Sequence, residues 1–559
     1  MYIIIDMHIV ENKTKAGKKI YQSILLRESY REDGKVKKRT VGNLSNCSVG
    51  EIAAIKLALK YKDNLTALAT LASLSDSIQL QEGLSIGAVF AVYQVAKGLG
   101  IETVLGTDFA GKLALWQVIA RVIDQGSRLS AVRLAKTHAI ADVLNLTRGF
   151  DENDLYDNLK WLAKNKERIE QELLGLRRSG SKPKLFLYDV TSSYLEGEQN
   201  YFAKFGYNRD GKKGKQQLVI GLLCDEMGEA VSIEAFAGNT QDPKTVGSQV
   251  KKIAEQFGCG EVTLVGDRGM IKSTQIAELP EYFHYITAIT KPQIETLVKK
   301  GVIQYELFDS VLGEIKDDHV RYIFRRNPIR AEEIVTGRQS KLNSMAKLVV
   351  VKNIYLEEHP KAKVETALKA VAARLKKLKI DEWLDVQAEG RVLRLVKNET
   401  ALEQMALLDG CYVIKTDLTR EMAEKEVVHD RYKDLAQVEK AFREMKTVNL
   451  EVRPVYVWKE QSTIGHVEIV MLSYMIIRRL QQAWAKFDLT VAEGLKQLET
   501  LCITEIRVND KKTALKIPQP REVSQKLLAA LELRLPEIVV PRKVNVVTRK
   551  KLPRKRKNP

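Results

Sequence analysis

Three acidic residues recur in similar settings along the chain, each beside an apolar segment. Asp189 stands where the strand-like run of LFLYDVTSSY gives out, and Asp267 ends the strand-like run EVTLVGD. Glu439 lies among apolar residues in RYKDLAQVEKAFREMK, a segment with helical periodicity. A buried carboxylate is costly unless hydrogen bonds, a cation or a metal ion stabilise its charge. We therefore expect the three side chains to meet, together with cations, at one edge of a sheet.

Such a gathering of acids predicts metal-dependent chemistry. Three neighbouring carboxylates repel one another unless cations neutralise them. Ligand sets made only of oxygen atoms select hard ions such as Mg²⁺ or Mn²⁺. Two such ions about 4 Å apart are the usual device for in-line displacement at phosphorus, because one activates the attacking oxygen and the other stabilises the leaving oxygen. The residues thus predict a two-ion site that acts on phosphodiesters.

A helix predicted over residues 421–446 has to bring Glu439 to the sheet. Four of its residues form an apolar stripe that can pack on the sheet: Leu435, Val438, Phe442 and Met445. Tyr432, Glu439 and Lys446 are spaced by seven residues, so they share a second face at the edge of that stripe. A helix docked by its stripe therefore presents Glu439 beside the strand ends.

The segments around the two aspartates follow the order β-β-β-α-β-α. This order describes an α/β layered domain with a mixed sheet. The regular pattern is lost between residues 292 and 408, where the strand-like pieces HVRYIFRR, MAKLVVVKNIYL and RVLRLVKN alternate with one basic helix. Strand-like sequence resumes at GCYVIKTD. We interpret residues 292–408 as an insertion in the α/β domain.

The remaining sequence predicts smaller regions on both sides of this domain. Residues 1–45 indicate strands with a hairpin turn at Asp33-Gly34. Residues 51–174 indicate helices, and residues 464–480 predict a core helix, because that apolar stretch contains charged side chains and is no membrane span. The predicted organisation is a β-hairpin segment (1–50), a helical domain expected to bind DNA (51–180), two parts of an α/β core (181–291 and 409–485) around the insertion (292–408), a helical region (486–540) and a basic disordered tail (541–559).

The charge balance indicates a polyanionic partner. The chain has 90 Lys and Arg against 71 Asp and Glu, a net charge of +19, and nucleic acid is the commonest partner of such proteins. The loop YNRDGKKGKQQ contains four basic residues, Arg209, Lys212, Lys213 and Lys215, which either contact phosphates or form a solvated loop. The basic tail likewise is either a non-specific DNA contact or a solvated segment.

The cysteines and the N-terminal sequence indicate a reducing compartment. The five cysteines are scattered and form no C-x-x-C pair, so neither a disulfide framework nor a cysteine zinc site is predicted. The sequence MYIIIDMHIVENK lacks the features of a signal peptide. A cytoplasmic protein, associated with the nucleoid of a bacterium or archaeon, is expected.

Four motifs together resemble those of the DDE transposases of bacterial insertion sequences. They are DVTSSY, AGNTQDPKTV, GDRGM and Y-x2-L-x3-E-x6-K. The similarity is to the branch with a Tyr-x2-Arg-x3-Glu-x6-Lys signature and a large insertion before the catalytic Glu (family four and its sixteen-thirty-four relatives). It implies an RNase H-like fold, a β-rich insertion over 292–408 that helps to hold the transposon end, and Asp189, Asp267 and Glu439 as the metal-binding triad.

The resemblance also implies roles for neighbouring residues. Tyr432 and Lys446 match signature positions that contact DNA phosphates near the cleaved end, and Arg268 lies next to an acid of the triad. Leu435 stands where the signature has Arg, so this charge has to come from elsewhere, for which Arg443 is the candidate. The implied partners are double-stranded DNA, as terminal inverted repeats and as target, and a second copy of the chain in a synaptic homodimer.

Other interpretations of the same residues stay open at this point. Asp189 could cap a turn with Thr191 or Ser192, Asp267 could pair with Arg268, and Glu439 could make a helical ion pair with Arg443. The corresponding functions are a DNA-binding protein without catalysis and a metal-dependent nuclease on the same fold. The first would bind DNA without cutting it, and the second would cut DNA without producing joined strands.

Overall fold

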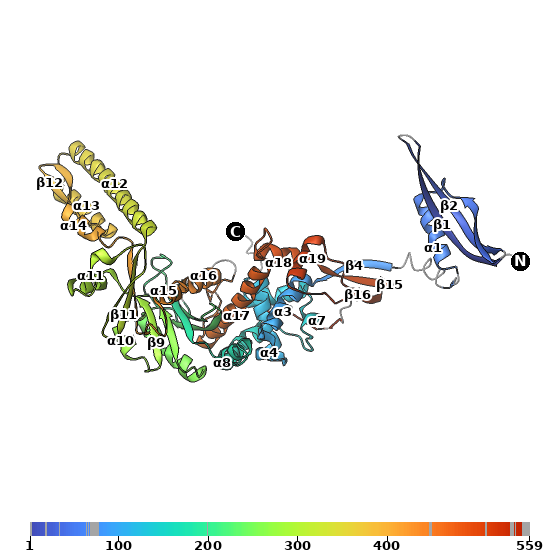
Figure 1. Ribbon diagram of the computed structural model, residues 1–559, viewed down its shortest axis with the longest axis horizontal. Coiled ribbons are helices and arrows are strands. Elements are labelled where there is room, and N and C mark those ends of the chain that lie inside the picture. The colour runs from blue at the N-terminus through green and yellow to red at the C-terminus, as the bar shows by residue number, and fades with distance from the viewer. Residues whose placement is uncertain are drawn as a thin grey trace, which may run out of the picture. The chain divides into compact units, whose positions relative to one another are not determined.

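The computed structural model describes residues 3–549 except 17–18, 33, 63, 65, 67–77, 198, 447–449, 455, 509–510, 537–540 and 543. The chain divides into two compact units, whose elements are labelled in Figure 1. The first unit comprises Met1–Gly83, Cys502–Gln519 and Pro536–Pro541, and the second comprises Leu84–Leu501, Pro520–Leu535 and Arg542–Pro559. The predicted catalytic residues all belong to the second unit.

The first unit contains two three-stranded sheets and helix α1 (Val49–Lys60). One sheet consists of β1 (Ile3–Ala16), β2 (Lys19–Glu32) and β3 (Lys35–Asn43), and the other of β4 (Ile78–Ser85), β15 (Cys502–Val508) and β16 (Lys511–Lys516). Gly34 has a φ of +73° in the predicted turn between β2 and β3, whereas residue 33 lies outside the described residues. The boundary predicted at residue 50 falls inside α1.

The second unit contains helices that we predicted before residue 180, but the ranges 51–174 and 486–540 are not helical throughout, because β4 lies in the first range and β15 and β16 lie in the second. Its helices are α3 (Gly87–Gly98), α4 (Ile101–Leu105), α5 (Phe109–Ile123), α6 (Arg128–Thr137), α7 (Ile140–Val143) and α8 (Glu152–Arg177), together with α18 (Val491–Glu499) and α19 (Glu522–Ala530). The apolar helix α17 (Glu460–Trp484) packs against α5, α8 and the sheet. It is a core helix, as predicted.

The catalytic sheet has eight strands in the order β10-β11-β14-β9-β8-β5-β6-β7. These are β5 (Leu185–Tyr194), β6 (Gln217–Asp225), β7 (Ala230–Ala237), β8 (Val262–Gly266), β9 (Phe283–Ala288), β10 (Gly313–Asp317), β11 (Val320–Arg326) and β14 (Cys411–Thr416). β8 is parallel to both β5 and β9, and the other pairings are antiparallel. The sheet is therefore mixed, as predicted.

Helices cover both faces of this sheet. Because side chains alternate along a strand, Phe186 and Tyr188 of β5 join one apolar cluster and Leu187 joins another. The first cluster includes residues of α9 (Pro243–Lys251), and the second includes α17 and α16 (Leu435–Lys446). Asp189 has the same parity as Leu187, so the alternation assigns it to the face that α16 covers.

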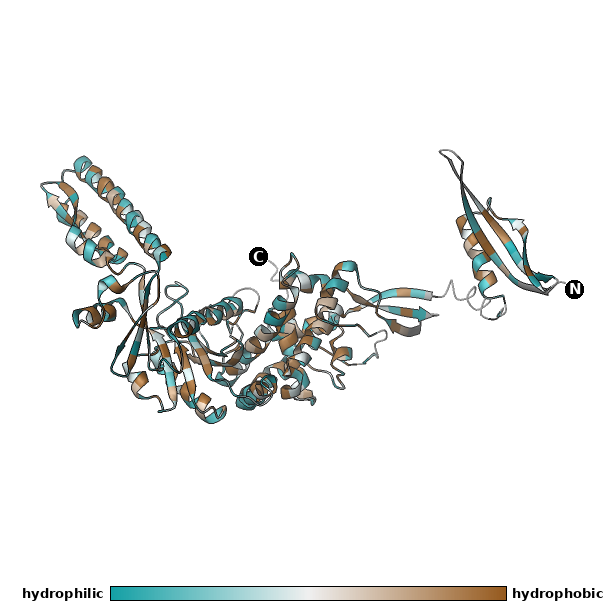
Figure 2. Ribbon diagram, viewed as in Figure 1, coloured by the Kyte–Doolittle hydropathy of each residue, from teal (hydrophilic) through white to brown (hydrophobic). Residues whose placement is uncertain are grey.

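The insertion is mainly helical, which differs from the β-rich insertion that we expected over 292–408. It lies between β11 and β14 and consists of α12 (Pro328–Glu358), α13 (Val364–Leu378), α14 (Glu399–Ala406) and one hairpin, β12 (Leu384–Glu389) and β13 (Val392–Lys397). The expected strand MAKLVVVKNIYL is part of α12, along which hydrophilic and hydrophobic residues alternate (Figure 2). Its buried residues Met345, Val349 and Leu356 have helical spacing and pack in the insertion's own core.

The helix predicted over 421–446 is two helices. α15 (Lys425–Lys433) ends at Asp434, and α16 begins with the next residue. Asp434 keeps right-handed helical angles, with φ −60° and ψ −17°, so the break is local. Tyr432 thus lies on a different helix from Glu439 and Lys446.

The start of the basic tail is ordered, contrary to the prediction of disorder over 541–559. The Arg542 N–H donates to Asp142 (2.6 Å) and the Val547 N–H donates to the Phe150 carbonyl (3.3 Å). The Arg549 side chain pairs with the Asp151 carboxylate. Contacts with the start of α8 therefore hold this segment, which a sequence reading based on charge alone cannot foresee.

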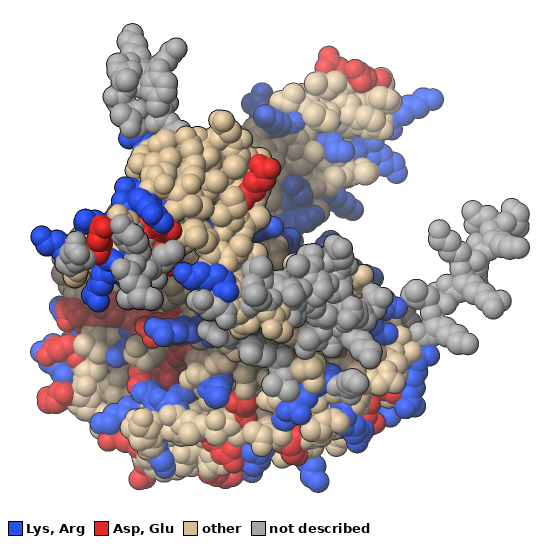
Figure 3. All heavy atoms as spheres, turned by 90° about the vertical axis from the view of Figure 1, so that its right-hand side faces the viewer, with Lys and Arg blue, Asp and Glu red and all other residues tan. Residues whose placement is uncertain are grey.

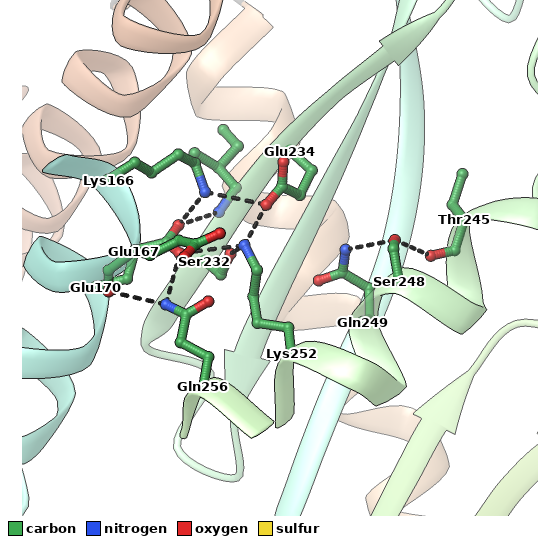
Figure 4. A network of polar contacts seen from close by, with 11 residues as sticks. Lys166, Glu167, Glu170, Ser232, Glu234, Thr245, Ser248, Gln249, Lys252 and Gln256 are labelled. Carbon is green, nitrogen blue, oxygen red and sulfur yellow. Dashed lines mark hydrogen bonds and ion pairs between the residues drawn. The ribbon is translucent and has the colours of Figure 1, made fainter. Parts of the chain in front are cut away.

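A buried ionic network fastens α8 to the edge of the catalytic sheet (Figure 4). Lys166 of α8 lies 2.5 Å from Glu170 and 3.1 Å from Glu234 of β7. Lys252 lies 3.2 Å from Glu170 and also pairs with Glu234. Lys252 opens a π-helical turn, Lys252–Gln256, that follows α9. Two lysines and two glutamates thus balance their charges, which buried groups require; Glu170 is fully buried, whereas Glu234 is 26% exposed.

Candidate active site

Asp189 lies in the middle of β5 and not at its end, which corrects the prediction. The strand continues to Tyr194, and Asp189 still pairs with Leu222 of β6. What ends there is the parallel pairing with β8, whose last pair is Tyr188 with Gly266. The Asp189 carboxylate accepts a hydrogen bond from the Val190 N–H (2.7 Å). Asp189 is thus placed beside the point where β8 stops.

Asp267 follows β8 directly, as predicted. Its carbonyl accepts the Met270 N–H (2.9 Å), which closes a turn, and its side chain is exposed. The Tyr432 hydroxyl donates to Asp267 Oδ1 (3.2 Å). Burial and the nearby Asp267 charge raise the pKa of Tyr432, so this hydroxyl keeps its proton at neutral pH and remains a donor.

Glu439 is exposed on α16 at the edge of the predicted apolar stripe. The stripe residues Leu435, Val438, Phe442 and Met445 are all buried, and α16 packs on β5 and β6. Leu435 is only 7% exposed. The departure from the signature therefore occurs at a position that faces the core, where a leucine packs and an arginine would need a partner.

One cavity of about 500 Å³ brings the three predicted acids together. Asp189, Asp267 and Glu439 line it, and so do the predicted basic residues Arg209, Arg443 and Lys446. Sequence reasoning missed a fourth acid on its wall, Asp242, although the motif AGNTQDPKTV that contains it was part of the resemblance. Three acids from β5, from the loop after β8 and from α16 thus share one hollow.

The electrostatics of Asp189 show that the acids influence one another. The pKa of Asp189 is raised to about 7, chiefly by burial and to a smaller extent by the charges of Asp267 and Glu439, while the Val190 N–H and Arg209 act in the opposite direction. Near neutral pH, the Asp189 carboxyl is therefore protonated in some of the molecules and charged in the others. A divalent cation bound by the three carboxylates would favour the charged form.

The acids do not form a preassembled metal site. Within the described part of the chain, no three His, Cys, Asp or Glu side chains are grouped closely enough to hold a metal ion. Asp267 and Glu439 are exposed, so small side-chain rotations are sterically open to them. The donor set itself, carboxylate oxygens on a partly buried wall, is the kind that Mg²⁺ and Mn²⁺ prefer.

The basic loop after β5 is tied across the cavity by two of its residues. The Arg209 guanidinium donates to the Val190 carbonyl (2.9 Å) and pairs with Asp242. The backbone N–H of Arg209 donates to Ser192 Oγ (3.0 Å). The next residue, Asp210, pairs with Lys446 of α16. The loop thus connects β5, the start of α9 and α16.

The other predicted basic residues are not among those that line this cavity. Lys212 Nζ is 5.6 Å from the centre of the Tyr194 ring, and Lys213 and Lys215 are exposed. Arg268 lines a second, larger groove of about 800 Å³ that also contains Asp267, Glu439 and Tyr432. This groove continues to the basic residues Lys291, Arg330, Arg338, Lys341 and Lys379, mostly of the insertion. Sequence reasoning missed the insertion residues because they are far apart in the chain.

Lys and Arg side chains are interspersed with Asp and Glu over the face drawn in Figure 3. The described helices include none that combines the length and the apolar character needed to cross a membrane.

Comparisons with known proteins identify the family of the chain. Residues 180–476, more than half of the chain, match the family model described as the transposase DDE domain, and residues 7–69 match that of the N-terminal domain of IS1634 family transposases. Together with the mixed sheet, the longer match defines an RNase H-like DDE transposase. The chain belongs to the IS1634 family of these insertion-sequence enzymes.

Two further comparisons add little to this assignment. A cryo-EM structure of the piggyBac transposase synaptic complex with hairpin DNA matches over 69% of this chain and 69% of that chain, with 8% sequence identity and a TM-score of 0.33. A search of curated proteins finds no match.

Proposed function

We propose that this transposase cuts DNA at the ends of its insertion sequence and joins the freed 3′-hydroxyl groups to target DNA, with Asp189, Asp267 and Glu439 holding two Mg²⁺ or Mn²⁺ ions. One observation carries the proposal: acids from three separate elements line the same cavity. Family membership supports it, because DDE transposase domains generally depend on divalent metals. The raised pKa of Asp189 also fits, since a bound cation would relieve the repulsion that contributes to it.

The bond changes are the same in both steps. A water oxygen, and later a DNA 3′-hydroxyl oxygen, bonds to phosphorus while the bond from phosphorus to the leaving 3′-oxygen breaks. Two divalent ions, when bound, stabilise the charge on the attacking and leaving oxygens. Asp189 has to lose its proton to serve as a ligand, and Tyr432 holds the Asp267 carboxylate in place by its hydrogen bond.

The basic residues around the cavity are proposed to hold the DNA backbone. Lys446, Arg443 and Arg209 line the cavity of the acids, where charge-assisted hydrogen bonds to phosphate oxygens are strong. Arg268 is proposed to contact phosphates from the larger groove, and Lys212, Lys213 and Lys215 from the loop. The Tyr432 hydroxyl donates its one proton to Asp267, so the phosphate contact that the resemblance implies for Tyr432 would require this bond to break. The Asp210 carboxylate forms an ion pair with Lys446. A phosphate that binds Lys446 therefore has to displace this carboxylate.

The larger groove gives the path that the DNA end would follow. It runs from the catalytic acids to the basic residues of the insertion, so the insertion is proposed to hold the terminal repeat by its backbone. The helical region before residue 180 is proposed as a further DNA-binding domain. Two ends have to be brought together for transposition, and a homodimer that carries one end per subunit is the arrangement we propose.

The test is cleavage of DNA that carries the element's terminal repeats, with Mg²⁺ or Mn²⁺. The wild type should release 3′-hydroxyl ends and form joined products with a second duplex. Asp189→Ala, Asp267→Ala and Glu439→Ala should each abolish cleavage and keep DNA binding. Glu278→Ala, which removes an exposed acid after α10 (Ser273–Ala277), is the matched control.

Two outcomes would contradict parts of this proposal. If any of the three variants cuts like the wild type, the ligand set is wrong. If the wild type cuts but never joins strands, whatever end sequence is supplied, the enzyme is a nuclease on this fold.

A further inference from the structure

A third hollow, separate from the cavity of the three acids and from the larger groove, is lined by buried arginines. It has a volume of about 120 Å³ and lies between the end of α5, the start of α6, α17 and the segment after α16. Arg121 and Arg128 line it together with His466, and each arginine is only 5% exposed. The volume is several times that of a water molecule. None of these three residues has a role in the catalytic proposal.

The acceptors around the two guanidinium groups are neutral. Arg121 donates to the Gln125 carbonyl (2.6 Å) and, more weakly, to that of Leu450 (3.5 Å). Arg128 donates to the Gln117 side-chain oxygen (2.6 Å). The Nε of Arg121 is buried without a hydrogen-bond partner among the described residues.

His466 adds no charge of either sign to the hollow. Its Nε2 lies 3.1 Å from the Val452 carbonyl, and its Nδ1 lies 3.4 Å from an Arg128 nitrogen. A neutral ring satisfies both contacts, with Nε2 as the donor and Nδ1 as the acceptor. Burial and the two arginine charges lower the pKa of His466 well below its usual value, which agrees with the neutral form.

The nearest carboxylates are already paired, although Glu451 itself lines the hollow, as does its partner Arg453. Glu451 accepts two hydrogen bonds from Arg453 (2.8 and 2.9 Å), and Asp124 accepts one from Ser130 (2.5 Å). In the part of the chain that the structure describes, neither Arg121 nor Arg128 forms an ion pair, although the charges of Asp124 and Glu451 act on Arg121 from a greater distance. Two cations are therefore buried side by side without an anion in contact.

Both arginines keep their charge at neutral pH. Burial lowers the pKa of Arg121 to about 10, and burial together with the Arg121 charge lowers that of Arg128 to about 9. Buried charges that lack a counter-charge destabilise a fold strongly. A bound anion removes this cost, and the planar forks of two guanidinium groups suit the oxygens of a phosphate group.

We propose that the hollow of Arg121 and Arg128 is a binding site for a tetrahedral phosphate group. The group is either a free phosphate ion or a phosphodiester of bound DNA, and both present the same oxygens. The rim is accessible, since Tyr456, which lines the hollow, is 64% exposed. Arg453 on the same rim lies 4.5 Å from the ring centre of Tyr194, the last residue of the strand that carries Asp189. A DNA strand that reaches the catalytic sheet can therefore reach this rim.

The first arm of the test measures thermal unfolding in phosphate and in chloride at equal ionic strength. The wild type should gain about 1–2 °C in phosphate, and Arg128→Met should gain nothing. In chloride, Arg128→Met should melt no lower than the wild type, because an uncompensated charge is gone. Arg133→Met, an exposed position on the same helix, should respond to phosphate like the wild type. Arg128→Lys, which keeps the charge without the fork, covers the case in which Arg128→Met does not fold.

The second arm measures binding of a duplex without divalent metal, so it does not depend on the proposed catalysis. If DNA is the occupant, Arg128→Met should weaken binding and reduce the slope of log K against log salt by about one, and Arg133→Met should not. If free phosphate is the occupant, DNA binding should be unchanged while the melting shift persists. The proposal is overturned if phosphate does not raise the melting temperature of the wild type and if Arg128→Met and Arg128→Lys bind DNA like the wild type.

Discussion

The Tyr432 hydroxyl donates a hydrogen bond of 3.2 Å to the Asp267 carboxylate, across 165 residues of sequence. This contact joins α15 to the loop after β8. It places an uncharged donor, whose pKa is raised by burial and by Asp267, against one of the three acids that we propose as metal ligands. A tyrosine in this position orients the carboxylate without competing for its charge.

Tyr432→Phe should therefore impair the use of metal more than the binding of DNA. Loss of an outer hydrogen bond to a metal ligand costs about 10-fold to 100-fold in metal affinity or activity. We expect the Mg²⁺ concentration for half-maximal cleavage to rise by about 10-fold. Tyr282→Phe, which alters a tyrosine that is 47% exposed, is the control. An unchanged Mg²⁺ requirement in Tyr432→Phe would show that the bond has no such role.

Asp210→Asn should strengthen DNA binding. Asp210 pairs with Lys446, and its removal leaves the lysine available for a phosphate. Affinity for a duplex without metal should rise several-fold, with a steeper salt dependence. Asp318→Asn removes the same charge from a side chain that is 83% exposed, so it separates the local effect from the change in net charge. Equal gains in both variants would refute a specific role for the pair.

Leu435→Arg recreates the sequence of the family signature, but it should not improve cleavage by this chain. Leu435 is 7% exposed and packs in the apolar stripe of α16. An arginine there buries a charge, and we expect the free energy of unfolding to fall by roughly 2–4 kcal/mol. Leu435→Met, which conserves volume, should cost less than about 1.5 kcal/mol. Denaturant titration measures both, and a stable Leu435→Arg enzyme with faster cleavage would contradict this account.

Cleavage should require more metal as the pH falls below about 7. Asp189 has a pKa raised to about 7, chiefly by burial, and only its charged form binds a cation. Each pH unit below 7 should therefore raise the half-maximal Mg²⁺ concentration by up to about 10-fold. Titrations of the cleavage rate with Mg²⁺ between pH 5.5 and 8.5 measure this requirement. A requirement that does not change over this interval would exclude Asp189 as the titrating ligand.

Stability should fall with rising pH because of Glu468. This residue of α17 is fully buried, both of its oxygens lack hydrogen-bond partners among the described residues, and burial raises its pKa to about 8. The folded state then holds a proton that the unfolded state releases near pH 4.5, so the free energy of unfolding decreases between about pH 4.5 and 8. Glu468→Gln should lack this decrease, which thermal unfolding at pH 6 and 9 would reveal. A parallel pH dependence in both proteins would rule the effect out.

Local sequence patterns were sufficient to single out the three acids that line one cavity. Asp267 directly follows an apolar strand, and Glu439 borders an apolar helical stripe. Each of these patterns is contained in about ten consecutive residues. Asp242 could not be assigned in this way, because only the tertiary fold brings the start of α9 to the cavity. The same holds for Arg330 and Lys379, which reach the larger groove from distant parts of the insertion.

The insertion shows where local patterns mislead. The run LVVVKNIYL contains β-branched residues that favour strands, yet packing against α13 and the hairpin β12–β13 keeps it helical in α12. Tertiary contacts overrode the propensity of these residues. The break at Asp434 was equally invisible, because the apolar spacing continues across it.

The insertion leaves and re-enters the catalytic sheet through adjacent strands. Arg326 of β11 pairs with Cys411 of β14, and the Asn327 N–H donates to the Gly410 carbonyl (2.8 Å). With its exit and return side by side and an apolar core of its own, this segment is a module that a short turn could replace. An enzyme shortened in this way would keep the three acids and lose the insertion, so that cleavage could be measured apart from the DNA contacts that we propose for the insertion.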